Sequence, residues 1–591
     1  MYHSALSFGF LDWDDMTYVI DYPNLGNVGY FWSSFSNGYI PITYTWWSLT
    51  LDVFGKNAAA FHYLNILFHI LTTLVVYFLL KSLLKYFYRF QKEILEKCGM
   101  FALMGALLFA VHPLQVESVC WITSLKDVSA GFFSCLALFY FVQFRLKNKK
   151  SFYSLGLISF LFAMLSKPTA VSVLLMILII DFLLFKKNVR NTIVSLVPWM
   201  IIALPILALN AYSQEKLISL YQAPWFTRPI IALDAMSFYL YKLFLPINIL
   251  PDYGRSPFNL IGGGLIYWTW IPVSILIAAS LIFVRCTRLT NSSIHQSTDS
   301  PIHKFIFLIS GLFLFIAGIL PVSGLIPFAA QNNSTVYDRY VYLSMLGTAL
   351  VFCFVLAEIK KNRKTALIIG CVLLAALSWR SMAQSQIWEN DFQLWNYTLV
   401  NKKNSVVAMI NLGRQFSAKG DITNAFRLYQ KAVEIAPYDP DAHNNLGSIL
   451  ARKGNFNSAE LHFREAVRLN PKLQTAHENL MRIYMLRHDW INARHCIRTL
   501  LKLNPRHVGA NLNQAEIYLH TQQFEKCINH LNEINRWLKN NSDLENFLGV
   551  AYAGLGNKVT AQMHFRKALE LNPKNKSAKQ NLSKSVLDMQ K

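Results

Sequence analysis

The chain has 591 residues, 53% of them hydrophobic and 15% charged, with a mean hydropathy of +0.29, and this balance excludes a purely soluble protein. The formal net charge is +23, but in the first 385 residues the basic side chains stand in clumps between apolar runs, which favours a membrane protein and makes nucleic-acid binding a poor explanation. The eight cysteines are scattered, mostly inside apolar segments, and without a CxxC or a metal-ligand spacing neither a disulfide framework nor a zinc site follows from them.

Ten apolar runs follow one another in the first two thirds of the chain and predict about ten membrane spans. The segment 152–185 would be about 51 Å long as one helix at ~1.5 Å per residue, too long for a hydrocarbon core of roughly 30 Å, so Lys167 and Pro168 are expected to split it into a hairpin. The predicted spans are 61–80, 98–114, 127–144, 152–166, 168–185, 191–211, 265–284, 305–326, 340–358 and 365–379.

The connecting loops differ in charge. The loops on one side of the predicted bundle hold 19 Lys and Arg, whereas those on the other side hold eight. Cytoplasmic loops are enriched in Lys and Arg, so the basic side is predicted to be cytoplasmic. The opposite side contains most of the acids, including the opening cluster "FLDWDDMTYV" at 10–19.

The last third of the chain is predicted to be an array of tetratricopeptide (TPR) repeats, each a helical hairpin. Five repeats are expected between about 406 and 573, the fourth degenerate, with a polar capping helix after them. Because the tenth span leaves on the acidic side, the array is predicted to lie outside the cytoplasm. The columns on the 34-residue register are Leu412, Leu446, Leu480 and Leu548; Ala425, Ala459, Ala493 and Ala561; and Pro437, Pro471, Pro505 and Pro573.

Ionisable residues gather in the loops of the acidic side, where they are costly and usually functional. Carboxylates could supply a general base, and an Asp among Phe and Trp could have its pKa raised by desolvation. Cations could offset charge on a leaving phosphate. The pattern indicates transfer from a lipid-linked phosphate donor to an acceptor outside the cytoplasm. The residues are Asp14, Asp15, His112, Glu117, Lys126, Asp127, Lys167, Asp252, Arg255, Asp338 and Arg339.

The acidic pair in the first outer loop resembles the signature of the GT-C membrane glycosyltransferases. The ordered set "WDDMTYV", "FAVHPLQVESVCWITSLKDV", "LSKPTAV", "LPDYGRSP" and "DRYVYL", followed by TPR units, is similar to the transmembrane-and-TPR protein O-mannosyltransferases and their bacterial relatives. The resemblance covers essentially the whole chain. It implies an all-α fold, with a GT-C-like transmembrane domain at 1–385 and an extracytoplasmic TPR domain at 386–591.

The resemblance also implies roles for individual residues. Asp14 or Asp15 would be the catalytic base, and nothing in the sequence separates the two. The donor phosphate and the acceptor would contact His112, Glu117, Lys126 and Asp127, with Lys167, Arg255 and Arg339 on the phosphate or head group. The donor would be a polyprenyl- or dolichyl-phosphate sugar, with a protein Ser or Thr in the TPR groove as acceptor. No metal ligand is assigned, and a divalent cation stays open as a cofactor. Related enzymes carry a membrane helix before the acidic loop, and only thirteen residues precede Asp14 here.

Structural interpretations compete with these roles. Asp14 and Asp15 could cap a helix, Glu117, Lys126 and Asp127 could form ion pairs within their own loop, and Arg339 could pair with its neighbour Asp338. At the level of function, transfer to a glycan or lipid acceptor and a membrane-anchored TPR scaffold are the alternatives. Compact loops favour a bacterial inner membrane over the endoplasmic reticulum membrane.

Overall fold

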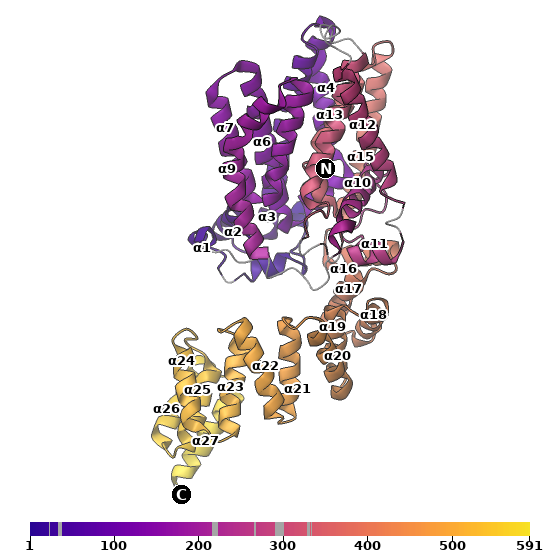
Figure 1. Ribbon diagram of the computed structural model, residues 1–591. Coiled ribbons are helices and arrows are strands. Elements are labelled where there is room, and N and C mark those ends of the chain that lie inside the picture. Colours follow the sequence, from indigo (N-terminus) through magenta and orange to yellow (C-terminus); the bar gives the residue numbers. More distant parts are fainter. Residues whose placement is uncertain are drawn as a thin grey trace. The chain divides into compact units, whose positions relative to one another are not determined.

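The computed structural model describes residues 1–22, 24–33, 38–214, 223–264, 268–289, 301–327, 331 and 334–590. Every regular element in these ranges is a helix, which confirms the all-α prediction. The chain divides into two compact units, Met1–Leu412 and Gly413–Lys591, coloured from indigo to brown and from brown to yellow in Figure 1.

The first unit begins with short elements that precede its first long helix. A 3-10 helix (η1, Tyr2–Ser7) and a π-helical turn (η2, Met16–Ile20) flank the acidic cluster. Helices α1 (Val28–Ser33) and α2 (Pro41–Phe54) follow. This opening segment is folded against the bundle, because Tyr2, Phe8, Leu11 and Val19 are all buried.

Each predicted span corresponds to a helical segment, and residues 265–267, at the start of the seventh span, lie outside the described residues. The described residues include six helices that are long and apolar enough to cross a membrane, and the remaining apolar helices are shorter, so the count of ten spans stays a prediction. The segments are α3 (Ala58–Phe87), α4 (Lys92–Val111), α6 (Leu125–Lys147), α7 (Lys150–Ser166), α8 (Ser172–Ile179) with η6 (Ile180–Leu184), α9 (Val189–Gln214), α12 (Ile271–Leu289), α13 (Pro301–Ile319), α14 (Met345–Glu358) and α15 (Arg363–Gln386).

The hairpin predicted within 152–185 is present. Helix α7 ends at Ser166, and the extended backbone of Lys167 is followed by the 3-10 helix η5 (Pro168–Val171), as a Pro at that position favours. Large apolar side chains of α9 and α15 are exposed, among them Ile201, Leu204, Ile368 and Val372. Without a membrane such exposure would be unfavourable, so these faces fit contact with lipid.

Short helices lie between the long ones, and they carry Glu117, Asp338 and Arg339. The chain between α4 and α6 forms η3 (Pro113–Gln115), α5 (Val116–Cys120) and η4 (Ile122–Ser124). The segment before α14 contains η9 (Leu320–Val322) and η11 (Asp338–Val341). The remaining elements of this unit are η7 (Trp225–Thr227), α10 (Arg228–Phe244), α11 (Pro257–Gly262) and α16 (Asp391–Asn401).

Paired helices of 12 to 14 residues form the repeat array. The five pairs and the final helix match the five predicted repeats and the cap, and the degenerate fourth unit is still a helical pair. The pairs are α17 (Val406–Ala418) and α18 (Ile422–Ile435); α19 (Pro440–Arg452) and α20 (Phe456–Leu469); α21 (Gln474–Leu486) and α22 (Trp490–Leu503); α23 (Val508–His520) and α24 (Phe524–Asn535); and α25 (Ser542–Gly554) and α26 (Lys558–Leu571), before α27 (Lys576–Gln590).

Candidate active site

Asp15 holds the acidic loop against the segment between α4 and α6. Its carboxylate accepts hydrogen bonds from the Leu11 N–H (3.1 Å) and the Thr123 N–H (3.0 Å), and a further one from the Thr123 hydroxyl. The side chain is only 1% exposed, and burial raises the pKa of Asp15 to about 7 in spite of these bonds. Because its carboxylate binds both Leu11 and Thr123, Asp15 is suited to position the acidic loop.

Asp14 differs from its neighbour. It is half-buried, and its carboxylate makes no hydrogen bond with the described residues. Burial raises the pKa of Asp14, and the positive charges of Lys126 and Arg339 oppose that shift. A carboxylate without a partner, close to two cations, can accept a proton from a bound molecule. The structure thus separates two acids that the sequence left equivalent.

Two stacked indoles join the acidic loop to the cations. The Trp13 ring stacks on Trp121 with 4.6 Å between centroids, and the Arg339 guanidinium lies 5.0 Å from the centroid of Trp121. The Lys126 ammonium lies 5.7 Å from the same indole. Lys126 makes no ion pair or hydrogen bond with the described residues, so its charge is available to a ligand.

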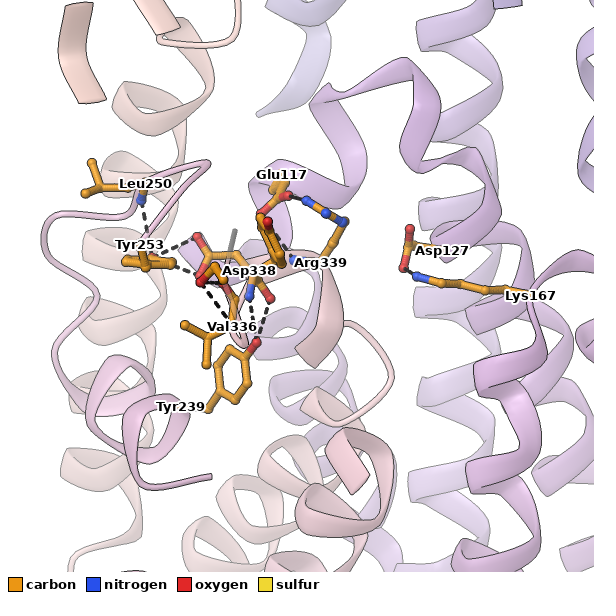
Figure 2. A network of polar contacts seen from close by, with 11 residues as sticks. Glu117, Asp127, Lys167, Tyr239, Leu250, Tyr253, Val336, Asp338 and Arg339 are labelled. Atoms are coloured by element: carbon orange, nitrogen blue, oxygen red, sulfur yellow. Dashed lines mark hydrogen bonds and ion pairs between the residues drawn. The ribbon is translucent and has the colours of Figure 1, made fainter. Parts of the chain in front are cut away.

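Arg339 pairs with Glu117 and not with its neighbour Asp338. Its guanidinium donates to one carboxylate oxygen of Glu117 and its backbone N–H to the other (3.3 Å), while the Tyr253 hydroxyl lies 3.0 Å from Asp338 (Figure 2). Burial raises the pKa of Glu117, and Arg339 opposes the shift. Burial, with the charge of Glu117 adding to it, raises the pKa of Asp338 well above its usual range. Arg339 therefore does not form an ion pair with its neighbour Asp338. Its partner, Glu117, lies 222 residues away in the sequence.

A second ion pair lies at a pocket. Lys167 donates to Asp127 at 2.5 Å, and its ammonium is 5.4 Å from the Tyr340 ring centroid. The space of about 390 Å³ that the pocket and its mouth span includes open solvent, and the enclosed part of the pocket is far smaller. Its wall comes from α6, η5, the start of α8, the end of α13 and η11, and includes Asp127, Ser134, Lys167, Ser172, Arg339 and Tyr340. Pairing of Asp127 within its own loop is therefore wrong, because its partner belongs to the next hairpin.

His112 and Arg255 bind parts of the protein other than the pocket residues. Both ring nitrogens of His112 lie near backbone atoms, Nε2 at 3.2 Å from the Leu243 carbonyl and Nδ1 at 3.3 Å from the Leu114 N–H, and burial lowers its pKa to about 4. Arg255 pairs with the buried Asp234 at 2.6 Å. Neither residue lines the pocket. Asp252, another acid of the outer loops, accepts from the Gly254 N–H and the Ser405 hydroxyl.

The structure thus brings together Asp14, Lys126, Asp127, Glu117, Lys167 and Arg339, and supports them with Asp15. Sequence reasoning missed Trp13, Trp121, Tyr253, Ser134 and Ser172. A helical spacing was the available signal for Ser134, because Asp127, Gly131 and Ser134 recur at intervals of four and three residues along α6. Among the described residues, no group of three His, Cys, Asp or Glu side chains is placed to hold a metal ion.

Comparisons with known proteins agree with this architecture. Residues 41–212 match the family described as dolichyl-phosphate-mannose-protein mannosyltransferase, and residues 413–454, 440–473 and 546–575 match TPR families. A protein O-mannosyl-transferase of Caenorhabditis elegans is 23% identical over 68% of this chain and 55% of its own length. Protein O-mannosyl-transferase TMTC1 of Homo sapiens is 22% identical over 69% of this chain and 49% of its own length. The chain therefore spans about half the length of the curated relatives it matches.

Among solved structures, YrrB, a TPR protein, aligns with 31% of this chain and 95% of its own, at 17% identity and a TM-score of 0.28. The sequence relatives are the stronger finding, because each aligns with about two thirds of this chain, whereas the solved structure aligns with less than a third of it. The chain is an integral membrane protein in which a segment similar to the dolichyl-phosphate-mannose-protein mannosyltransferase family precedes TPR repeats, and it resembles the protein O-mannosyl-transferases over about two thirds of its length.

Proposed function

We propose that this protein transfers a sugar such as mannose from a polyprenyl- or dolichyl-phosphate donor to the hydroxyl of a protein Ser or Thr. The observation that carries the proposal is the convergence of one unpartnered carboxylate, Asp14, with the cations Lys126 and Arg339 from separate segments. Such a constellation suits a reaction in which a hydroxyl loses a proton while a phosphate gains charge. Homology to protein O-mannosyl-transferases supports the same chemistry.

Asp14 is the proposed base. Its carboxylate takes the proton of the acceptor hydroxyl as the hydroxyl oxygen attacks the anomeric carbon of the sugar. The bond between that carbon and the phosphate oxygen breaks, and its electron pair leaves with the lipid phosphate. A base works best when its pKa approaches the working pH, and burial shifts the pKa of Asp14 in that direction.

Lys126 is the proposed principal contact of the donor phosphate. Arg339 and Lys167 already have carboxylate partners, whereas Lys126 has none among the described residues. A cation beside a leaving phosphate stabilises the charge that grows there in the transition state. Lys126 supplies that charge from the chain itself, and a divalent cation remains an open cofactor, which transfer assays with and without EDTA distinguish.

The repeat array is the proposed holder of the acceptor polypeptide. Asn445, Asn479 and Asn513 occupy the same position of three successive repeats, 34 residues apart, each on the first helix of its pair. The Asn479 amide nitrogen donates to Asn444 (3.0 Å) and lies 3.3 Å from the Ser448 hydroxyl, so it links neighbouring repeats. A primary amide both donates and accepts, which suits an extended peptide backbone of any sequence.

The proposed location of the site and the array is the extracytoplasmic side of a bacterial inner membrane, with the endoplasmic reticulum lumen as the eukaryotic equivalent. The bias of Lys and Arg toward the opposite loops supports this orientation. A single exposed cysteine introduced into the array should react with a membrane-impermeant maleimide added outside intact cells. Protection of that cysteine would contradict the orientation.

The decisive experiment compares Asp14→Asn with the parent in the purified full chain, using polyprenyl-phosphate mannose and a Ser/Thr peptide. Loss of the base should lower kcat by about 100- to 10,000-fold, the usual contribution of general base catalysis. The unfolding midpoint should stay unchanged, because Asp14 makes no hydrogen bond with the described residues. Asp21→Asn, a change at an exposed acid of the same loop, is the matched control.

Undiminished transfer by Asp14→Asn and by the Asp14→Asn/Asp15→Asn double variant would contradict the catalytic assignment. Transfer to a glycan or lipid but to no peptide would identify a different acceptor class. A parent protein that transfers no sugar to any acceptor, while its repeats still hold a partner protein, would support a scaffold instead.

A further inference from the structure

The pocket beside the proposed catalytic groups contains buried polar atoms without partners. Asp127 Oδ2, Ser134 Oγ and Ser172 Oγ are enclosed and have no hydrogen-bond partner among the described residues, and all three residues line the pocket. Their side chains are at least nine-tenths buried, with exposures of 7%, 0% and 1%. A buried hydroxyl or carboxylate oxygen without a hydrogen bond lowers the stability of the protein. Three such oxygens at one pocket therefore indicate a ligand that forms hydrogen bonds with them.

The charges around this pocket cancel. Lys167 is paired with Asp127 at 2.5 Å and Arg339 with Glu117, so neither cation retains an uncompensated charge (Figure 2). A phosphate placed here would have to compete with two carboxylates for these cations. The cation without a partner, Lys126, does not line the pocket. The pocket therefore suits a neutral ligand, and the phosphate belongs outside it.

The arrangement of the unpaired oxygens favours a polyhydroxylated ligand. Asp127 and Ser134 lie on one face of α6, with Gly131 between them, and Ser172, at the start of α8, lines the same pocket. The rings of Tyr340 and Tyr342 form another part of the wall. Unpaired oxygens from two helices, together with two tyrosines in the same lining, match the hydroxyl groups and the C–H faces of a sugar ring.

We propose that this pocket is the subsite for the sugar ring of the lipid-linked donor, with Asp127 Oδ2, Ser134 and Ser172 hydrogen-bonding the sugar hydroxyls. The assignment rests on the proposed function, since it takes the donor to be a lipid-phosphate sugar. It places the sugar beyond Arg339 and the phosphate at Lys126. Gly131 keeps the pocket in shape, because a Cβ at this position would lie 2.3 Å from the Tyr342 ring.

Serine variants test the assignment by binding, apart from transfer. Ser134→Ala and Ser172→Ala each remove a hydroxyl that is unpaired in the unliganded protein, so neither should lower the unfolding midpoint. Isothermal titration of the full chain in detergent compares short-chain polyprenyl-phosphate mannose with the same polyprenyl phosphate lacking sugar. Each variant should lose about 3- to 10-fold in affinity for the mannose-bearing lipid, as expected for one neutral hydrogen bond.

Affinity for the bare polyprenyl phosphate should stay unchanged in both variants. Ser118→Ala is the matched control, because Ser118 is also buried and unpartnered but does not line the pocket, and it should alter neither affinity. An equal loss for both lipids would overturn the proposal by placing the phosphate in this pocket. Unchanged affinity of the Ser134→Ala/Ser172→Ala double variant for the mannose-bearing lipid would overturn it as well.

The binding test separates this proposal from the proposed function. A protein that binds the mannose-bearing lipid in a serine-dependent way but transfers no sugar would support the subsite and contradict the function. A protein that transfers mannose with wild-type donor affinity in both serine variants would support the function and overturn the subsite.

Discussion

The membrane unit and the repeat array differ in how their polar side chains find partners. In the membrane unit, Arg339 pairs with Glu117 across 222 residues, and Lys167 with Asp127 across 40. In the array, Arg487 pairs with Glu460 across 27 residues and Asn479 with Asn444 across 35, and both partners belong to the preceding repeat. Each repeat therefore depends only on its neighbours, whereas the site in the membrane unit exists only once the whole bundle is assembled.

Burial differs in the same way. The side chains of Arg339 and Glu117 are 8% and 1% exposed, whereas those of Arg468 and Glu465 in the array are 62% and 32% exposed. A buried pair that loses one member leaves an uncompensated charge away from water, while an exposed pair is replaced by solvent. The same substitution should therefore have very different effects in the two units.

Replacing Arg339 by Met gives the largest expected loss of stability. Glu117 would keep a buried charge without its partner, and breaking such a pair costs about 3–5 kcal/mol. Arg468→Met is the matched change in the array and should leave the unfolding midpoint where it is. Thermal unfolding of both variants in detergent measures the difference. Similar midpoints for the two variants would show that the pairs are energetically equivalent and would remove the contrast between the units.

The buried acid of the membrane unit predicts a pH dependence. Burial raises the pKa of Asp15 to about 7, so the folded protein holds a proton that the unfolded chain releases near pH 4. The stabilising contribution is fully present below about pH 4 and is lost as the pH rises through about 7. Between these values the free energy of unfolding should fall by roughly 2–4 kcal/mol because of Asp15.

Asp15→Asn should remove this fall in the free energy of unfolding with rising pH. Asp21→Asn, at an exposed position of the same segment, should retain it. Denaturant unfolding of the full chain at a series of pH values from 4 to 8 is the measurement. Parallel profiles for the parent and Asp15→Asn would mean that Asp15 titrates alike in the folded and unfolded states.

The two units also differ in how far they could be predicted. A 34-residue register fixes the repeats because adjacent repeats bury the same columns against one another, so even the fourth unit, with Gln514 in the leucine column, forms the expected helical pair. Long apolar runs likewise identified the helices of the membrane unit. In both cases the prediction depends on residues that are close together in the sequence.

Partner choice in the site could not be predicted, because it depends on contacts between distant segments. Asp14 and Asp15 are neighbours of the same residue type, and only the three hydrogen bonds from Leu11 and Thr123 distinguish them. Arg339 lies beside Asp338 in sequence and yet pairs with Glu117. Arg255 has the charge expected of a phosphate contact, but Asp234, on a helix with no recognisable motif, binds its guanidinium.

Glycine substitutions compare the membrane unit with the repeat array through smaller expected losses of stability. A Cβ at Gly131 would lie 2.3 Å from the Tyr342 ring at the pocket, and one at Gly447 would lie 2.8 Å from the Phe463 ring between two repeat helices. Both changes overpack a close helix contact and should cost about 1–3 kcal/mol. Gly131→Ala should also weaken binding of polyprenyl-phosphate mannose, since Tyr342 forms part of the pocket wall.

Gly447→Ala should leave donor binding unchanged, because the strain stays within its repeats. Unfolding midpoints report the cost, and isothermal titration with the donor reports the pocket. A loss of donor affinity in Gly447→Ala equal to that in Gly131→Ala would contradict the independence of the two units.

The smallest expected effect concerns the asparagines that recur in the array. Asn479→Ala removes one of the amides proposed to hold the acceptor backbone, and a single neutral hydrogen bond corresponds to about a 3- to 10-fold change in affinity. The KM for a long Ser/Thr peptide should rise by that factor, while the KM for the lipid donor stays constant. Asn492→Ala, on the second helix of the same repeat, is the control and should change neither constant. A peptide too short to reach beyond the catalytic groups should be transferred equally well by Asn479→Ala and the parent. If the short peptide loses as much as the long one, the array acts on the site through the fold and does not hold the acceptor.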